Sequence, residues 1–262
     1  MRPLRPLLPT VVADLRGHDV PLYAAGLTFY GGIALLPTTL VALWLAGLVL
    51  GSARVARLGD RVGDALPPDL GAPEVASTLV DAGARLGWVT ALVAVVPATL
   101  YGEGLRRAFV RLENHDEAYV GWRGRLGVLP LLAATPLMAV PVLLLAPLLA
   151  RLTDAGGWSS ALAAYLALCL DWVLLTPPLA YVYRVLSPRP PTWRAAFVAG
   201  TVTASLVSGF LQGFVLFLAI PLDLGLPFGG FVAVGAVVAV ALWLWVLHLL
   251  VLVGHSLSVA LA

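Results

Sequence analysis

The chain has 262 residues, of which 60% are hydrophobic and 11% are charged. Soluble domains carry about 25% charged residues, so this chain has too few charges to cover a water-soluble globule of its size. The composition also excludes intrinsic disorder, which needs low hydrophobicity and high net charge. The net charge of +2 does not indicate a nucleic-acid partner, and the single cysteine excludes an intramolecular disulfide.

Six apolar runs follow one another along the chain, at residues 21–50, 86–102, 126–150, 161–183, 195–220 and 231–254. Their lengths match the roughly 20 residues that a helix needs to cross the hydrocarbon core of a bilayer. Strands of membrane barrels are shorter and alternate in polarity, so these runs are predicted to be helices. The fold class is therefore all-α, a polytopic membrane helix bundle of about six spans in a single transmembrane domain, residues 1–262.

The arginines indicate how the bundle is oriented. With the N-terminus in the cytoplasm, most arginines lie on the cytoplasmic side, as the positive-inside rule requires, and both termini are predicted to be cytoplasmic. The first outer loop runs against this trend, because it holds four arginines. These are Arg54, Arg57, Arg61 and Arg85.

Short amphipathic helices are predicted outside the spans. In the outer loop, residues 51–85, two sets of apolar residues recur at helical spacing on either side of Pro67 and Pro68. Such helices either lie in the membrane interface or cap the outer mouth of the bundle. The first set is Val55, Leu58, Val62 and Leu66, and the second is Val75, Leu79, Ala82 and Leu86. A similar stripe of Val11, Val12 and Leu15 precedes the first span.

Proline and glycine are frequent within the predicted spans. A proline removes a backbone hydrogen bond and bends the helix, and broken helices are typical of transporter sites, although proline is also common in membrane helices. Pairs of small residues let helix backbones approach closely, either within the monomer or at a homo-oligomer interface. The candidates for bending and packing are Pro37, Gly47, Gly51, Pro136, Pro141, Pro177, Pro178, Gly209 and Gly213.

Four polar residues at or near membrane depth form the candidate polar site. Asp171 lies near the centre of the fourth run, and an intramembrane carboxyl group costs about 2.5–3.5 kcal/mol. It is either a proton, cation or substrate site, or a carboxyl hydrogen-bonded to a neighbouring helix. Glu103 follows the second run and can pair with arginines three or four residues later. Gln212 and His248 either line a path or hydrogen-bond between helices.

No catalytic site is predicted. The four histidines lack metal-ligand spacing, and the chain has neither a GxSxG elbow nor a phosphate-binding GxxxxGK[ST] loop. Asp116 and Glu117 beside His115 are interpreted as a solvated turn. We therefore expect a protein that is not an enzyme and that has no cofactor and no metal site.

Several segments resemble the YihY/BrkB family of bacterial inner-membrane proteins. The first is Ala24 to Leu43, AAGLTFYGGIALLPTTLVAL, and the others are the basic loop Gly104 to Leu126, the turn LAYVYRVLSP, and the glycine-rich entry to the last span. One departure concerns the end of the chain. The family often ends with a glycine, a small residue and a glutamate, whereas here Gly254 is followed by His255 and Ser256.

The resemblance implies a six-helix protein of the bacterial plasma membrane that supports envelope integrity. The prolines and Asp171 favour transport of a lipid or another amphiphile as its activity. The first alternative is a scaffold that transports nothing and organises other envelope proteins. The second is an intramembrane enzyme, which requires acid, histidine or serine groups to converge. The ribonuclease label that this family has carried has no support, because the sequence has no clustered metal ligands. The bilayer and a lipid or amphiphile substrate are the expected partners, and nucleic acid is not.

Overall fold

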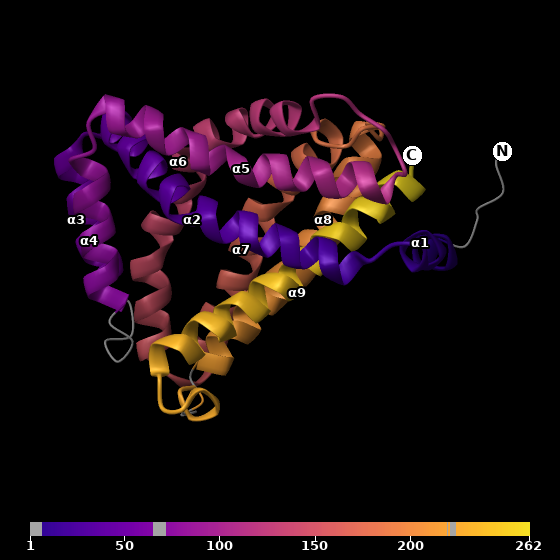
Figure 1. The fold of residues 1–262 in the computed structure, drawn as a ribbon. Coiled ribbons are helices and arrows are strands. Elements are labelled where there is room, and N and C mark those ends of the chain that lie inside the picture. Colours follow the sequence, from indigo (N-terminus) through magenta and orange to yellow (C-terminus); the bar gives the residue numbers. More distant parts are fainter. Residues whose placement is uncertain (1–6, 65–71, 219, 221–223) are drawn as a thin grey trace. The chain divides into compact units, whose positions relative to one another are not determined.

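Helices make up every regular element that the structure describes. The computed structural model covers residues 7–64, 72–218, 220 and 224–262, and the all-α architecture predicted from the sequence is confirmed (Figure 1). The elements in chain order are α1 (Leu7–Arg16), α2 (Val20–Leu50), α3 (Ser52–Asp64), α4 (Ala72–Ala84), α5 (Trp88–Leu112), α6 (Val120–Asp154), α7 (Gly157–Val185), α8 (Trp193–Leu218), the 3-10 turn η2 (Leu226–Phe228) and α9 (Val232–Ala260).

Five helices in the described part are long and apolar enough to cross a membrane: α2, α5, α7, α8 and α9. The remaining predicted span, residues 126–150, lies within α6, which is helical throughout its 35 residues. The side chains at positions 139, 140, 143, 144, 146, 147 and 150 of α6 lie outside the described residues. Large apolar side chains such as Val49 and Leu137 are exposed on these helices, as a lipid-facing surface requires.

Two spans continue as helices beyond the apolar runs that predicted them. Helix α5 extends ten residues past position 102, and α9 extends six residues past position 254. The reason is that polar side chains in both extensions are buried against other segments of the chain. Arg106 and His255 are 8% and 1% exposed. Hydropathy therefore locates the start of these helices but not their end.

The chain divides into two compact units. The first comprises Met1–Gly32, Gly102–Gly124 and Asp171–Ala262, and the second comprises Ile33–Tyr101 and Arg125–Leu170. Helices α2, α5, α6 and α7 each contribute residues to both units. The single domain over residues 1–262 stays a prediction.

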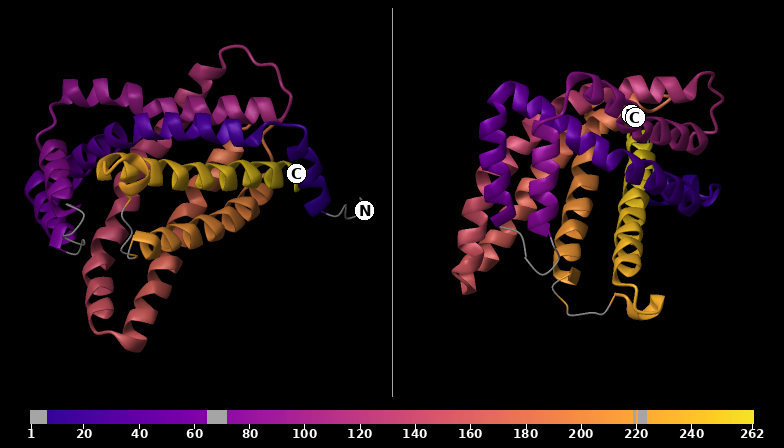
Figure 2. Two further views of the ribbon diagram at one scale, coloured as in Figure 1. Left: turned by 60° about the horizontal axis from the view of Figure 1, so that its bottom comes forward. Right: turned by 60° about the vertical axis from the view of Figure 1, so that its left-hand side comes forward.

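In the first unit, α8 and α9 pack side by side and antiparallel (Figure 2). Near one end of the pair Gly254 contacts Thr203, and near the other Gly213 faces Trp243. The rings of Phe210, Phe214 and Phe217 surround the Trp243 ring at centroid distances of 5.0 to 6.2 Å. Gly213 therefore serves packing within the monomer. Gly209 has no atom within 4 Å of the place a Cβ would take.

In the second unit, α2, α5 and α6 share a small apolar core of Val41, Ala98 and Leu132. Helices α3 and α4 form the predicted amphipathic pair and pack on each other, where Gly59 lies directly against Val80. The packed face of α4 differs from the predicted stripe. Val75 and Ala82 of that stripe are exposed, whereas Gly83 packs against Leu43 of α2. The side chains of Leu58 and Val62, together with Leu66, Pro67 and Pro68, lie outside the described residues.

The prolines lie within continuous helices. Helix α2 contains Pro37, and α7 contains Pro177 and Pro178. In α6, Pro136 and Pro141 are half-buried. Since Pro136 has no N–H, it leaves the Leu132 carbonyl without its helix bond, and the Thr135 hydroxyl donates a 2.7 Å hydrogen bond to that oxygen. A neighbouring side chain thus satisfies the group that this proline frees.

Gly47 and Gly51 do not act as a helix-packing pair in the described part of the chain. Gly51 lies just after α2 with φ of +86°, a left-handed conformation that ends many helices. A Cβ on Gly47 would meet only the backbone of Ser52, at 3.9 Å. Gly51 therefore terminates the first span.

Candidate functional site

The intramembrane carboxyl of Asp171 on α7 is paired with Gln212 on α8. The Gln212 side-chain amide donates a 2.8 Å hydrogen bond from Nε2 to Asp171 Oδ2, and both residues are half-buried. The next residue, Trp172, joins the same two helices by donating its indole N–H to the Thr201 carbonyl at 3.0 Å. The carboxyl group thus has a neutral partner on another span, so these contacts do not cancel its charge.

Glu103 is 8% exposed and pairs with an arginine on its own helix. Its Oε1 lies 2.8 Å from Nη2 of Arg107, which is the i, i+4 pair that the sequence analysis considered. The first turn of α6 covers the pair, because a Cβ on Gly121 would lie 3.0 Å from Glu103 Oε1. Arg106, the i+3 partner, binds elsewhere.

His248 on α9 is buried and contacts Thr28 on α2, with 3.2 Å between Nδ1 and Oγ1. The Thr28 hydroxyl also donates to the Ala24 carbonyl at 2.9 Å. Of the four residues predicted as a polar site, Asp171 and Gln212 bond to each other in the described part of the chain. Glu103 and His248 each have separate partners within the described residues.

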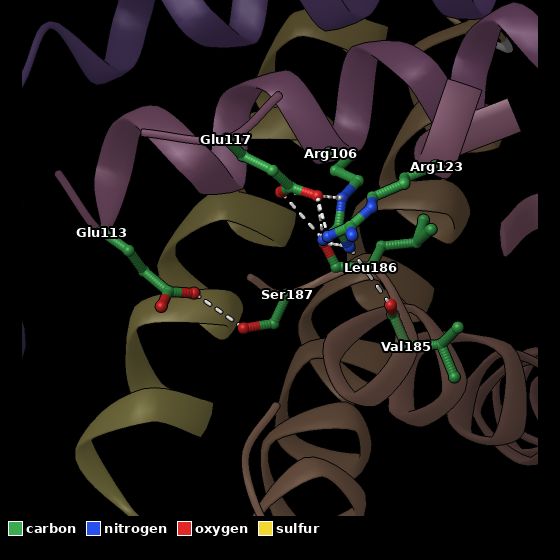
Figure 3. Close-up of polar contacts among 7 residues, drawn as sticks. All are labelled: Arg106, Glu113, Glu117, Arg123, Val185, Leu186 and Ser187. Atoms are coloured by element: carbon green, nitrogen blue, oxygen red, sulfur yellow. Dashed lines mark hydrogen bonds and ion pairs between the residues drawn. The ribbon is translucent and has the colours of Figure 1, made fainter. Parts of the chain in front are cut away.

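A larger buried polar cluster, which the sequence analysis missed, lies where α5, the loop after it, α7 and α9 meet. Its centre is Arg106, whose Nε and Nη2 bind both carboxylate oxygens of Glu117 at 2.7 to 3.2 Å (Figure 3). The remaining nitrogen, Nη1, donates to the Leu186 carbonyl at 3.2 Å, beside the C-terminal end of α7. Arg123 adds a second bond to Glu117 at 2.7 Å.

The charges of this cluster determine the ionisation of Glu117. Its side chain is 5% exposed. Burial acts to raise the pKa of Glu117, but hydrogen bonds and charge attraction from Arg106 and Arg123 outweigh it, and the pKa lies below its ordinary value. The interpretation of Glu117 as part of a solvated turn is therefore wrong. It is a buried anion that joins the α5–α6 loop to Arg106 on α5.

Next to this ion pair, Glu113, Ser187 and His255 form a second group, the Glu113 cluster. Glu113 Oε1 lies 2.7 Å from Ser187 Oγ and 3.1 Å from His255 Nε2. The His255 ring stacks on Phe109, with 3.8 Å between ring centroids and 5° between ring planes. His255 lies near the C-terminal end of α9 and is 1% exposed.

Tyr183 completes the packing around His255. Its hydroxyl donates to the Val251 carbonyl at 3.0 Å and lies 3.1 Å from Thr203 Oγ1. Gly254 makes this possible, because a Cβ there would overlap both the Tyr183 and Thr203 oxygens. The Tyr-Arg turn and the final glycine, both part of the family resemblance, thus meet at one place in the first unit.

Sequence patterns carry little signal for these contacts. Glu113 and His255 are 142 positions apart, and Arg106 and Leu186 are 80 apart. The one available signal is a set of acids between two groups of arginines at 103–125. In the described residues, no group of three or more histidine, cysteine or acidic side chains could hold a metal ion.

Together, the apolar helices and buried polar pairs define a multi-pass membrane protein of the helical class. The family profile described as virulence factor BrkB matches residues 11–262, and the chain belongs to this family. The resemblance found in the sequence is thereby confirmed. Neither a curated protein nor a solved structure matches the chain.

Proposed function

We propose that this protein supports the integrity of the bacterial envelope by moving a lipid or another amphiphile in the plasma membrane. The observation that carries the proposal is the Asp171–Gln212 pair, in which a carboxyl group between two spans has a neutral amide as its partner among the described residues. Intramembrane acids are costly and are typical of substrate or ion paths. In this proposal both termini lie in the cytoplasm, and the arginine distribution supports that orientation.

Asp171→Asn tests this proposal, because the asparagine keeps the size and the hydrogen bond while removing the ionisable group. The variant is expressed in cells whose own copy is deleted, and sensitivity to detergents and bile salts is compared with wild type. Glu74→Gln, an exposed acid outside the spans, is the matched control. We expect Asp171→Asn to fail and the control to complement. Full complementation by Asp171→Asn would remove this residue from the mechanism.

The substrate is sought by profiling the lipids of the deletion strain. A lipid that accumulates on one leaflet is then added to vesicles containing the purified protein. Faster transbilayer movement with wild type than with Asp171→Asn supports transport. Equal rates in wild-type and protein-free vesicles, for each lipid that accumulates, contradict it.

A scaffold that moves nothing is the second candidate, and one observation favours it. The four predicted polar residues form separate pairs in the described residues rather than one lined path. A scaffold predicts partners that co-purify in stable amounts and complementation by Asp171→Asn. In both candidates the protein is not an enzyme and does not bind nucleic acid.

A further inference from the structure

The turn that joins α7 to α8 carries positive charge without matching acids. Three arginines, which we call the arginine turn, lie at the end of α7, in the turn itself and in the first turn of α8. They are Arg184, Arg189 and Arg194. Residues 172–222 contain no acidic residue. Within the described part of the chain, none of the three arginines has an ion pair.

The acids that approach this turn from α5 and the loop after it are bonded to other groups. Glu113 contacts Ser187, whereas Glu117 binds Arg106 and Arg123. Both acids therefore have nearer partners than the arginine turn, whose charge is left for a ligand from outside the chain.

Arg184 shows most directly that an anion is missing. It is half-buried, and its guanidinium carbon lies 5.6 Å from the centroid of the Trp193 ring, so the ring holds the cation in place. Its Nε is buried and has no hydrogen-bond partner among the described residues. A charged donor without an acceptor is costly away from water. A guanidinium group binds the oxygens of a phosphate through two parallel hydrogen bonds, which would remove that cost.

Aromatic side chains at the start of α8 indicate where this turn lies in the bilayer. Trp193 and Phe197, four residues apart on one helix face, are 57% and 56% exposed. Tryptophan is enriched at the boundary between hydrocarbon and headgroups, where its ring is apolar and its N–H meets water. The arginines on either side of Trp193 are therefore expected at the depth of the lipid phosphates.

The backbone of the turn is held in one shape by contacts with its surroundings. Arg106 Nη1 donates to the Leu186 carbonyl at 3.2 Å, and Ser187 Oγ lies 2.9 Å from the Arg189 carbonyl oxygen. Pro191 is fully buried. A binding group whose backbone is already ordered loses less entropy when its ligand binds, which favours a defined site over a loose attraction to the membrane surface.

We propose that the arginine turn and the Trp193 ring bind the phosphate headgroup of an anionic phospholipid in the leaflet next to the turn. The guanidinium groups supply charge and hydrogen-bond donors for the phosphate. A zwitterionic lipid binds less well, because it brings a positive charge of its own. The inference goes beyond the proposed transport and does not depend on it, since a lipid bound at this turn need not cross the membrane.

Native mass spectrometry of the full-length protein in a neutral detergent tests the site. Bound lipids are counted during titration with phosphatidylglycerol or with phosphatidylcholine, and we expect tighter binding of phosphatidylglycerol. Arg189→Gln and Arg194→Gln should each weaken it about fivefold, as expected when one basic residue is removed from an anionic surface. Both side chains are exposed, so the fold should be retained. Arg111→Gln, at an exposed arginine of α5, is the matched control and should keep the wild-type affinity.

The result that overturns the proposal is an unchanged affinity in both turn variants, or an equal loss in Arg111→Gln. The first outcome would leave the arginines a role in orientation only, and the second would reduce the binding to general surface charge. Inorganic phosphate should not displace the lipid when added at the same concentration. Displacement would assign the site to a free phosphate ion and contradict a lipid site.

Unfolding temperature provides a second measurement, which also covers Arg184. Phosphatidylglycerol should raise the unfolding temperature of wild type and Arg111→Gln, and raise it less in Arg184→Gln. If Arg184→Gln does not fold, the same comparison is made with Arg189→Gln, and an equal rise in that variant contradicts the site. Asp171→Asn should bind the lipid like wild type, so that a failure of transport and a failure of this site are distinguishable. Loss of binding in Asp171→Asn would place the lipid elsewhere and overturn the proposal.

Discussion

Arg106 binds Glu117 through two nitrogens and the end of α7 through the third, so one buried side chain joins three segments of the chain. Arg106→Ala should therefore lower the free energy of unfolding by about 3 kcal/mol, because it leaves Glu117 and the Val185 and Leu186 carbonyls with fewer partners. Thermal unfolding of the detergent-solubilised protein measures this loss. Arg111→Ala, at an exposed arginine five residues later, should change the stability by less than about 0.5 kcal/mol. Equal losses would contradict the role of Arg106.

The ionisation of Glu117 predicts a loss of stability in acid. Its pKa is lower in the folded protein than in the unfolded chain, so its contribution is fully present above the ordinary glutamate value of about 4.3. That contribution disappears as the pH falls through the folded value. Unfolding temperature measured against pH should therefore fall less steeply in acid for Glu117→Gln than for wild type. Asp116→Asn should retain the wild-type slope.

Two glycines on neighbouring helices allow a direct comparison of packing. Gly254→Ala places a methyl group on the oxygens of Tyr183 and Thr203, and we expect a loss of about 1–3 kcal/mol from overpacking. Gly209→Ala meets open space in a helix and should gain up to about 1 kcal/mol from helix propensity. Chemical unfolding in detergent measures both. A neutral Gly254→Ala would show that α7, α8 and α9 can separate at this point without cost.

Threonine hydroxyls in two helices should differ in their importance. Thr135 satisfies the Leu132 carbonyl that Pro136 frees, so Thr135→Val should cost about 1 kcal/mol. Thr39 donates to the Leu35 carbonyl at 2.9 Å, and the helix partner of that carbonyl is the backbone N–H of Thr39 itself, which Pro37 does not remove. Thr39→Val should therefore be nearly neutral. Thermal unfolding measures the stability that each valine variant loses. Equal losses would show that the carbonyl freed by Pro136 does not depend on the Thr135 hydroxyl.

Hydropathy was sufficient to predict the helices because it is a local property. The uncharged run at 21–50 became α2 within one residue, and the run at 231–254 predicted the start of α9 equally well. The polar ends of α5 and α9 were not predicted, because the segments that bury them are distant in the sequence. His255 is polar by type and enclosed only because Phe109, Tyr183 and Glu113 surround it.

The candidate site was predicted only where the chemistry was unusual for its surroundings. An acid such as Asp171 stands out within a run of apolar residues, and its Gln212 partner was among the few polar residues available on other spans. Glu113 and Glu117 instead lie in a loop rich in charges, where a solvated acid and a buried one look the same in sequence. Only their three-dimensional neighbours distinguish them.

Because Gly254 lies against Tyr183 and Thr203, we expect substitutions at these positions of α9, α7 and α8 to be coupled in evolution. Any relative that carries alanine at the equivalent of Gly254 needs smaller groups opposite it, such as phenylalanine for Tyr183 and alanine for Thr203. Substitutions at these three positions should consequently appear together when many homologous sequences are aligned, so this junction evolves as a unit.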